Sequence, residues 1–131
     1  MVAYSFKTRF GPLIQSRAKT QTVRADRKRH ARPGETLQLY TGMRTRSCRL
    51  LATATCAAVS PIRFDFDPAM TGRIEVHGVS TMHLADLDHF ARSDGFEDWA
   101  DLKRFWAREH PGLEAFEGVL IRWDSDSLVL P

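Results

Sequence analysis

The spacing of hydrophobic residues changes along the chain from strand-like to helical and back, and this change restricts the folds open to it. Segments rich in β-branched residues or alternating in polarity predict strands at residues 4–6, 20–24, 36–41, 49–59, 62–66 and 73–76. Apolar positions three and four apart predict two later helices, over residues 84–91 and 99–106, and residues 116–123 predict a closing strand. Early strands followed by two helices and a last strand predict an α+β domain.

Turn signals and side-chain size refine this prediction. Gly11-Pro12 predicts the start of a short helix, Pro33-Gly34 predicts a turn, and residues 67–72 are expected to join two strands. Asp94-Gly95 predicts the end of the first long helix. Because residues 49–59 carry mostly small side chains, we expect a small, tightly curved β-barrel with the helices packed on one side.

The chain has 131 residues and no repeat, low-complexity tract or long linker, so we predict a single domain over residues 1–131. No segment approaches the ~20 apolar residues of a membrane-spanning helix, and residues 1–10 lack the apolar core of an export signal. Cys48 and Cys56 fit no common zinc pattern. We therefore expect a cytoplasmic protein with buried free thiols, no membrane contact, no metal and no cofactor.

Charge is distributed unevenly along the sequence. Residues 1–50 carry 12 Lys or Arg and two acidic residues, a net charge of +10, whereas residues 51–131 carry a net charge of −7. Such a polarised chain creates a local field that attracts polyanions. The alternative is that the two halves neutralise each other across the fold. The charge pattern thus favours an anionic partner such as RNA or a nucleotide.

The most informative segment is the polar strand predicted at residues 20–24. Side chains alternate along a strand, so Thr20, Thr22 and Arg24 should share one face. Lys19, Gln21 and Val23 should share the other, except that alternation does not apply to Lys19 if it lies in the turn before the strand. An Arg guanidinium beside two hydroxyls suits phosphate or carboxylate. The same pattern also fits a strand face that only contacts water.

Basic side chains that could contact phosphates cluster near this strand and in two loops: Arg24, Arg27, Lys28, Arg29, Arg32, Arg44 and Arg46. Binding through such contacts would weaken steeply with salt. Tyr40 or Phe10 could stack on a base, as in the recognition of single-stranded RNA.

The chain resembles the ASCH domain family over nearly its whole length. The residues that carry the resemblance are Lys19-Thr20-Gln21-Thr22-Val23-Arg24, which matches a Lys-Thr-x-Thr-x-Arg signature, then Pro33-Gly34-Glu35-Thr36-Leu37, Phe90-Ala91-Arg92-Ser93-Asp94-Gly95-Phe96 and Phe116-Glu117-Gly118-Val119-Leu120-Ile121-Arg122-Trp123. The resemblance implies a PUA-like barrel with a cleft and a role in RNA binding or RNA-linked chemistry.

One branch of that family removes acetyl from acetylcytidine. The resemblance places its catalytic Lys on Lys19, its Thr on Thr22 and its acid on Asp94, where many members have Glu. A ribonuclease activity is attributed to other members. We therefore expect RNA or nucleotide binding first, with an amidohydrolase or a ribonuclease as alternatives.

The amidohydrolase alternative requires Lys19 to be neutral. Thr22 can attack a carbonyl carbon only if a base takes its proton, and Lys19 is that base only when neutral. Its usual pKa of ~10.4 would have to fall to about 7–8. We expect Arg17 and Arg24 to lower the pKa of Lys19 and Asp94 to raise it. Alternatively, Asp94 only terminates its helix.

Overall fold

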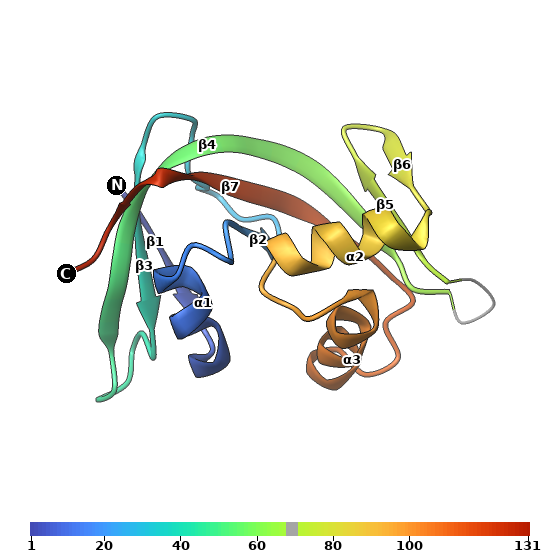
Figure 1. Cartoon of the computed structure of the whole chain (residues 1–131), viewed down its shortest axis with the longest axis horizontal. Helices are drawn as coiled ribbons and strands as arrows, with labels where there is room; N and C mark the ends of the chain where they lie inside the picture. Colours follow the sequence, from blue (N-terminus) through green and yellow to red (C-terminus); the bar gives the residue numbers. More distant parts are fainter. Residues whose placement is uncertain (68–70) are drawn as a thin grey trace.

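The structure is a computed structural model that describes residues 1–67 and 71–131. The described residues form seven strands, a 3₁₀ helix and three α-helices (Figure 1). Their bounds are β1 Val2–Phe6, η1 Thr8–Phe10, α1 Gly11–Gln15, β2 Gln21–Arg24, β3 Thr36–Thr41, β4 Arg49–Asp65, β5 Arg73–Val76, β6 Val79–Thr81, α2 Leu84–Ser93, α3 Trp99–Glu109 and β7 Ala115–Val129. The predicted α+β class is confirmed.

Two long antiparallel strands, β4 and β7, form the frame of the sheet. They arch over the three α-helices, which lie on the concave side (Figure 1). β3 pairs antiparallel with the first part of β4 and parallel with β1, and β5 pairs with the last part of β4 and with β6. β2 pairs with β7 over only four residues. The helices therefore pack on one side of the sheet, as the order of elements predicts.

The strand pairings do not close the sheet into the expected barrel. In the described part of the chain, β1 pairs only with β3 and β2 only with β7, so no backbone ladder joins β1 to β2. The Arg24 guanidinium bridges this gap, because its Nη2 donates a 2.6 Å hydrogen bond to the backbone carbonyl of Ser5. A side chain thus takes the acceptor that a neighbouring strand would otherwise use.

Several predicted strands differ in extent. Segments 49–59 and 62–66 form one continuous strand, β4, and the closing strand reaches Val129. Strand β6 has only three residues, which is too short for a sequence pattern. Residues 68–70 of the turn expected over 67–72 lie outside the described part of the chain. Cys56 is buried as expected, but Cys48 is exposed in the loop after β3.

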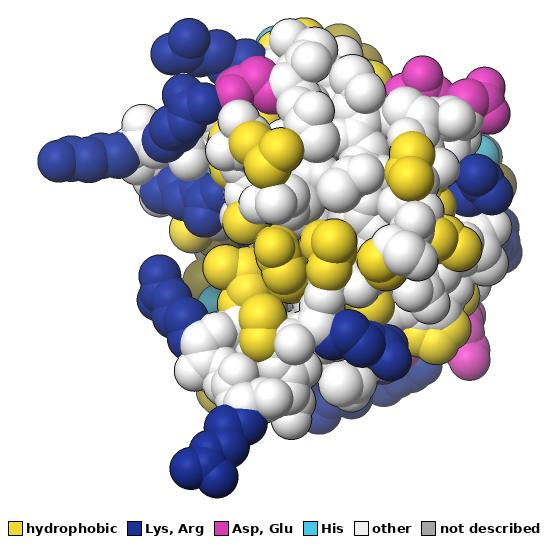
Figure 2. All heavy atoms as spheres, turned by 90° about the vertical axis from the view of Figure 1, so that its left-hand side faces the viewer, with side chains coloured by type: hydrophobic (Ala, Val, Ile, Leu, Met, Phe, Trp, Pro, Cys, Tyr) yellow, Lys and Arg dark blue, Asp and Glu magenta, His cyan; other side chains and the backbone are white. Residues whose placement is uncertain are grey.

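One end of the molecule carries both chain termini (Figure 1). Viewed from this end, hydrophobic side chains occupy the middle of the surface, and Lys and Arg side chains project around them (Figure 2).

Among the described residues, no helix has the length and the apolar character needed to cross a membrane.

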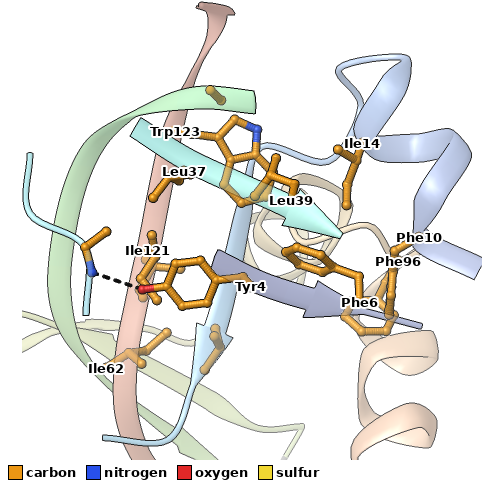
Figure 3. Packing of buried hydrophobic residues seen from close by; sticks show 14 of the residues in the cluster. Tyr4, Phe6, Phe10, Ile14, Leu37, Leu39, Ile62, Phe96, Ile121 and Trp123 are labelled. Carbon is orange, nitrogen blue, oxygen red and sulfur yellow. Dashed lines mark hydrogen bonds between the residues drawn. The ribbon is translucent and has the colours of Figure 1, made fainter. Parts of the chain in front are cut away.

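The core is rich in aromatic rings on the side where the helices pack. Phe64 of β4 lies edge-on against Trp99 and Trp106 of α3, with centroids 6.2 and 5.1 Å away. At the other end, Phe6 meets Trp123, and Phe10 meets Phe96, again edge-on (Figure 3). Edge-to-face pairs at these distances add to the energy of burial. Trp99 and Trp106 of the predicted helix are therefore part of the core, and Phe105 packs partly buried against it.

Candidate functional site

A cavity of about 420 Å³ lies between β1, β2 and the helices, with β7 at one side. Its walls are largely aromatic, from Phe6, Phe10, Phe96, Phe105, Trp106 and Phe116. Eight polar or charged residues also line it: Ser5, Lys7, Lys19, Thr22, Arg24, Asp94, Glu109 and His110. The cavity is therefore apolar on its sides and carries a few convergent polar groups, which is typical of small-molecule sites.

The segment before β2 places Lys19 at the cavity. Arg17 adopts a left-handed conformation with φ of 71°, which turns the chain at the end of α1. The backbone N–H of Lys19 then donates to Leu13, and that of Thr20 donates to Ser93 at the end of α2, both at 3.0 Å. Lys19 thus lies in a turn that two helices hold, and its side chain is only 2% exposed.

Asp94 reaches the same cavity from the C-cap of α2. Its backbone N–H donates to Phe90 and Ala91 at 3.1 Å. The next residue, Gly95, has a φ of +95°, and a Cβ there would lie 2.8 Å from Cδ of Lys19. This position needs glycine twice over, for its left-handed backbone and for the close approach of Lys19. The helix end and the lysine therefore fit each other only with glycine at this position.

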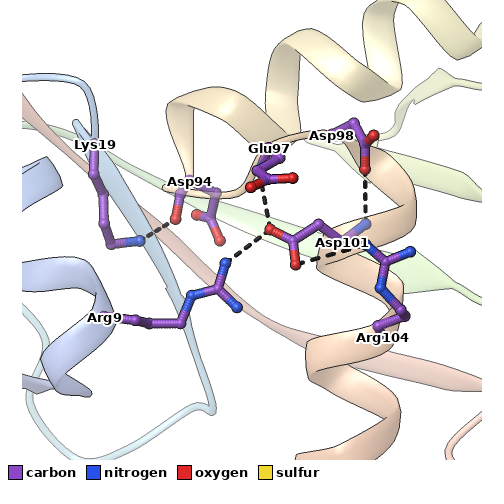
Figure 4. Close-up of polar contacts among 7 residues, drawn as sticks. All are labelled: Arg9, Lys19, Asp94, Glu97, Asp98, Asp101 and Arg104. Atoms are coloured by element: carbon purple, nitrogen blue, oxygen red, sulfur yellow. Dashed lines mark hydrogen bonds and ion pairs between the residues drawn. The ribbon is translucent and has the colours of Figure 1, made fainter.

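Lys19 and Asp94 meet inside the protein (Figure 4). Lys19 Nζ donates to the backbone carbonyl of Asp94 and lies over the Phe10 ring, 4.7 Å from its centroid. Asp94 is 4% exposed. Its carboxylate accepts a hydrogen bond from Gln21 and not from Lys19, with Nε2 of Gln21 3.3 Å from Oδ1. The structure thus brings the predicted Lys and acid together through a main-chain contact.

Burial changes the acid–base properties of both groups. Desolvation lowers the pKa of Lys19 to about 8, with help from Arg24 and Arg9, while the charge of Asp94 opposes this shift. Desolvation raises the pKa of Asp94 to about 6, against Lys19, Gln21 and Arg24. Burial thus has the largest effect on Lys19, and Arg9 contributes where Arg17 was expected. A lysine and an aspartate that both titrate near neutral pH suit proton transfer.

Thr22 and Arg24 share a face of β2, as the alternation predicts. Nε of Arg24 donates to Oγ1 of Thr22 at 3.1 Å, and the guanidinium carbon lies 4.7 Å from the centroid of the Phe6 ring. Desolvation lowers the pKa of Arg24 to about 10, so it stays charged at neutral pH. Within the described residues, Thr22 has no hydrogen bond to Lys19 or Asp94. The structure therefore brings Thr22 into the same cavity as Lys19 and Asp94 but not into direct contact with either.

The other predicted binding residues lie away from this cavity. Thr20 borders a separate hollow of about 600 Å³ between β7 and α2. Arg27 lies over the Tyr4 ring at 4.7 Å, and Arg29 pairs with Glu35 at 2.6 Å. Lys28, Arg32, Arg44 and Arg46 are exposed, and Tyr40 is half-buried on β3. The structure thus divides the predicted basic cleft into a buried site with Arg24 and two basic loops outside it.

The first basic loop, residues 25–32, follows the free edge of β1 and begins at the cavity, which Ala25 lines. The Tyr4 hydroxyl anchors this loop. It accepts from the backbone N–H of Ala31 at 3.1 Å and pairs with Nδ1 of His30 at 3.0 Å. Nε2 of His30 contacts the carbonyl of Ala25 at 3.0 Å. A buried hydroxyl therefore ties an exposed basic segment to the rim of the site.

Sequence reasoning missed Gln21 and most of the aromatic walls. Strand alternation places Gln21 on the face opposite Thr22, and only the structure shows that this face meets Asp94. Trp106 lies in the helix predicted over residues 99–106 and is 8% exposed, but it also lines the cavity. A stripe at helical spacing cannot indicate by itself that one of its rings borders an empty volume.

Neither a metal site nor a known relative adds to this description. Across residues 1–67 and 71–131, no group of three His, Cys, Asp or Glu side chains could hold a metal ion. Comparison of the chain with protein-family models, with curated proteins and with solved structures finds no match in any of the three.

Proposed function

We propose that this chain is an ASCH-like domain of PUA-like type that binds a nucleoside or a single nucleotide in the cavity and hydrolyses an amide on its base, with acetylcytidine as the first candidate substrate. One observation carries the proposal: Lys19, Thr22, Arg24 and Asp94 line the same aromatic-walled cavity although Asp94 is 70 residues from Arg24 in sequence. These are the positions that the resemblance assigns to catalysis, together with the Arg of the same signature.

The size and chemistry of the cavity support a nucleobase as ligand. Its volume of about 420 Å³ falls within the usual range of small-molecule sites, ~300–1,000 Å³. Aromatic walls offer stacking partners for a planar ring, and stacking on aromatic side chains is the common way in which proteins hold single bases. A long polymer cannot enter such a volume, so RNA would present one base at a time.

The polar side chains support acyl transfer. Neutral Lys19 Nζ takes the proton of Thr22 Oγ1 while that oxygen forms a bond to the acyl carbon. The C–N bond then breaks, and the Lys19 ammonium returns the proton to the leaving nitrogen. Water releases the acid from the acyl-threonine in a second step that uses Lys19 in the same way. The Arg24 Nε contact holds Thr22 in place at 3.1 Å.

Asp94 supports the charge change of Lys19 during this cycle. An ionised carboxylate near Nζ stabilises the ammonium that forms when Lys19 accepts a proton, as its opposing influence on the pKa of Lys19 indicates. With the pKa of Asp94 at about 6, the carboxylate is ionised where Lys19 begins to lose its proton. The pair therefore has the charge state that the reaction needs from about pH 7 upward.

RNA binding by the basic loops is the second candidate function. Within the described residues, Lys28, Arg44 and Arg46 are exposed and form no ion pair with an acid. Free cations of this kind contact phosphates and release counterions, which makes affinity salt-dependent. This function does not need the cavity to be catalytic.

The experiment is to incubate the purified protein with acetylcytidine and, separately, with a short single-stranded RNA, and to follow free acetate and RNA length. We expect acetate release that disappears in Lys19→Met, which keeps the side-chain length without the amine. Lys28→Met is the matched control, because it removes an exposed lysine of the basic loop, and we expect it to keep full activity. Cleaved RNA would instead support the ribonuclease alternative, and no acetate release would refute the amidohydrolase proposal.

A further inference from the structure

The Asp94 carboxylate has two oxygens in different situations. Oδ1 accepts from Nε2 of Gln21, whereas Oδ2 has no hydrogen bond within the described residues. Lys19 donates to the backbone carbonyl of Asp94 and not to the carboxylate. A buried carboxylate beside a lysine would ordinarily pair with it directly. Some other group therefore fixes the direction of this side chain.

Gln21 is placed to be that group. Its side chain is 3% exposed, and its backbone is held in β2 opposite Arg122 of β7. The amide is therefore fixed from the sheet side, while Asp94 is fixed from the end of α2. Gln21 also lies between Lys19 and Thr22 in sequence, so it shares their short, rigid segment.

We propose that Gln21 is a positioning residue for the reaction: its amide holds Asp94 as an oriented carboxylate, with Oδ1 occupied and Oδ2 left for the ligand. This inference rests on the proposed function for its kinetic consequence, but not for its geometry. Donors to an ionised carboxylate stabilise the charged form, so the amide keeps Asp94 ionised at lower pH than burial alone would allow. Gln21 itself transfers no proton.

The charged groups around Asp94 come from three elements. Lys19 and Arg24 approach from the β2 segment, and both favour the ionised carboxylate. Arg9 of η1 lies on the other side, but it is paired with Asp101 of α3 at 2.7 Å. Asp101 engages Arg9 directly. Among the described residues, Gln21 is the only side chain that donates a hydrogen bond to the Asp94 carboxylate.

The test uses two variants of Gln21. A packing role and a positioning role predict different effects of these variants on the titration midpoint of Asp94. Gln21→Met keeps the chain length and removes the donor. Gln21→Glu keeps the shape and places a second carboxyl beside Asp94. We expect the titration midpoint of Asp94, followed by carbon NMR of its carboxyl, to rise by about one pH unit in Gln21→Met. We expect a larger rise in Gln21→Glu, because two adjacent carboxylates repel.

The kinetic readout is the acid side of the pH–rate profile. We expect kcat to fall about tenfold in Gln21→Met, with a smaller change in KM, and the lower break of the profile to move to higher pH with the Asp94 midpoint. Gln38→Met, on the half-buried face of β3, is the matched control for removing a glutamine. A thermal melt of each variant separates loss of fold from loss of function.

The possible results separate this inference from the proposed function. If the Asp94 midpoint stays in place or falls, or if Gln21→Glu behaves like the unmodified protein, Gln21 is only a packing residue and the inference is overturned. If the midpoint rises but no substrate is turned over by the unmodified protein, the hydrolase proposal fails while Gln21 still holds Asp94. A raised midpoint together with a shifted profile supports both.

Discussion

The charged side chains of the cavity are buried, whereas those of the basic loops are exposed to solvent. Lys19 and Asp94 are 2% and 4% exposed, and burial moves the pKa of each toward neutrality. Lys28, Arg44 and Arg46 are exposed to water, where charges attract distant anions without losing hydration. The difference is consistent with our proposal that the cavity transfers protons and that the loops attract an anionic partner. The following changes test that division, from the largest expected effect to the smallest.

Removing the nucleophile should have the largest effect. Thr22→Val keeps the shape of the side chain and removes the hydroxyl, so we expect kcat/KM for acetylcytidine to fall by roughly 10³-fold or more. Thr53→Val, half-buried on β4, is the matched control and should change little. Steady-state acetate release measures both. Activity that survives in Thr22→Val would transfer the nucleophile to another group, such as water.

The dependence of turnover on pH should follow the buried pair. Lys19 acts as base only when neutral, so kcat/KM should rise as pH increases through about 8, and below about 6 it should fall more steeply as Asp94 is protonated. Salt-dependent RNA binding by the loops should stay nearly constant over the same range, because it does not use the buried pair. A kcat/KM that decreases as the pH is raised from 6 to 8 would contradict the role of Lys19 as a base.

Neutralising the pair should stabilise the fold while it removes activity. The pKa of Lys19 is lowered and that of Asp94 is raised on folding, so each ionised form opposes folding, most strongly between about pH 6 and 8. We expect Lys19→Met combined with Asp94→Asn to change the free energy of unfolding by up to about 1–4 kcal/mol in favour of the fold. Urea unfolding at pH 7 measures this change. Clear destabilisation of the double variant would make the pair a structural salt bridge.

Truncating the exposed cations should affect RNA binding alone. In the triple variant Lys28→Ala, Arg44→Ala and Arg46→Ala, we expect the affinity for single-stranded RNA to fall about tenfold and the salt slope to lose ~0.7 for each phosphate contact removed. Fluorescence anisotropy at several salt concentrations measures both quantities. Thr22→Val should bind as tightly as the unmodified protein. An unchanged slope in the triple variant would argue against phosphate contacts in these loops.

Releasing the anchor of the first basic loop should have the smallest effect. Tyr4→Phe removes the hydroxyl that Ala31 and His30 contact, at 3.1 and 3.0 Å, and leaves a buried N–H without its acceptor. We expect a loss of about 1–2 kcal/mol in the free energy of unfolding. We also expect faster amide hydrogen exchange in residues 25–32, with unchanged exchange in β7. Exchange that stays slow in the loop would show that Arg27 and Glu35 hold it without Tyr4.

Most of the helices and strands could be predicted from the sequence, and the family resemblance pointed to several polar residues of the site. Hydrophobic spacing located both long helices, and the segment from Lys19 to Arg24 pointed to the residues that meet in the cavity. Alternation also predicted correctly that Thr22 and Arg24 share a face. These successes rest on local patterns, which a linear sequence contains in full.

The parts that failed depend on contacts between distant segments. The side chain of Arg24 donates a hydrogen bond to the backbone carbonyl of Ser5, at the place where β1 and β2 would pair in a closed barrel. Gln21 meets Asp94 only because β2 lies beside the end of α2. The basic residues seemed to form one cleft because they are close in sequence, whereas Tyr4 and Glu35 hold some of them outside the cavity. Such placements follow from packing and cannot be predicted from spacing.

The pairing of β2 with β7 has a consequence for the order in which the site forms during synthesis. Gln21 lies opposite Arg122 in the sheet, and β7 is the only strand that pairs with β2 in the described part of the chain. A nascent chain that has emerged only as far as α3 therefore has Lys19, Thr22 and Asp94 but lacks the strand that pairs with Thr22. Contacts between such distant residues also form late in folding. Thr22 would thus be fixed beside Lys19 and Asp94 last, when the rest of the domain is already in place to enclose the site.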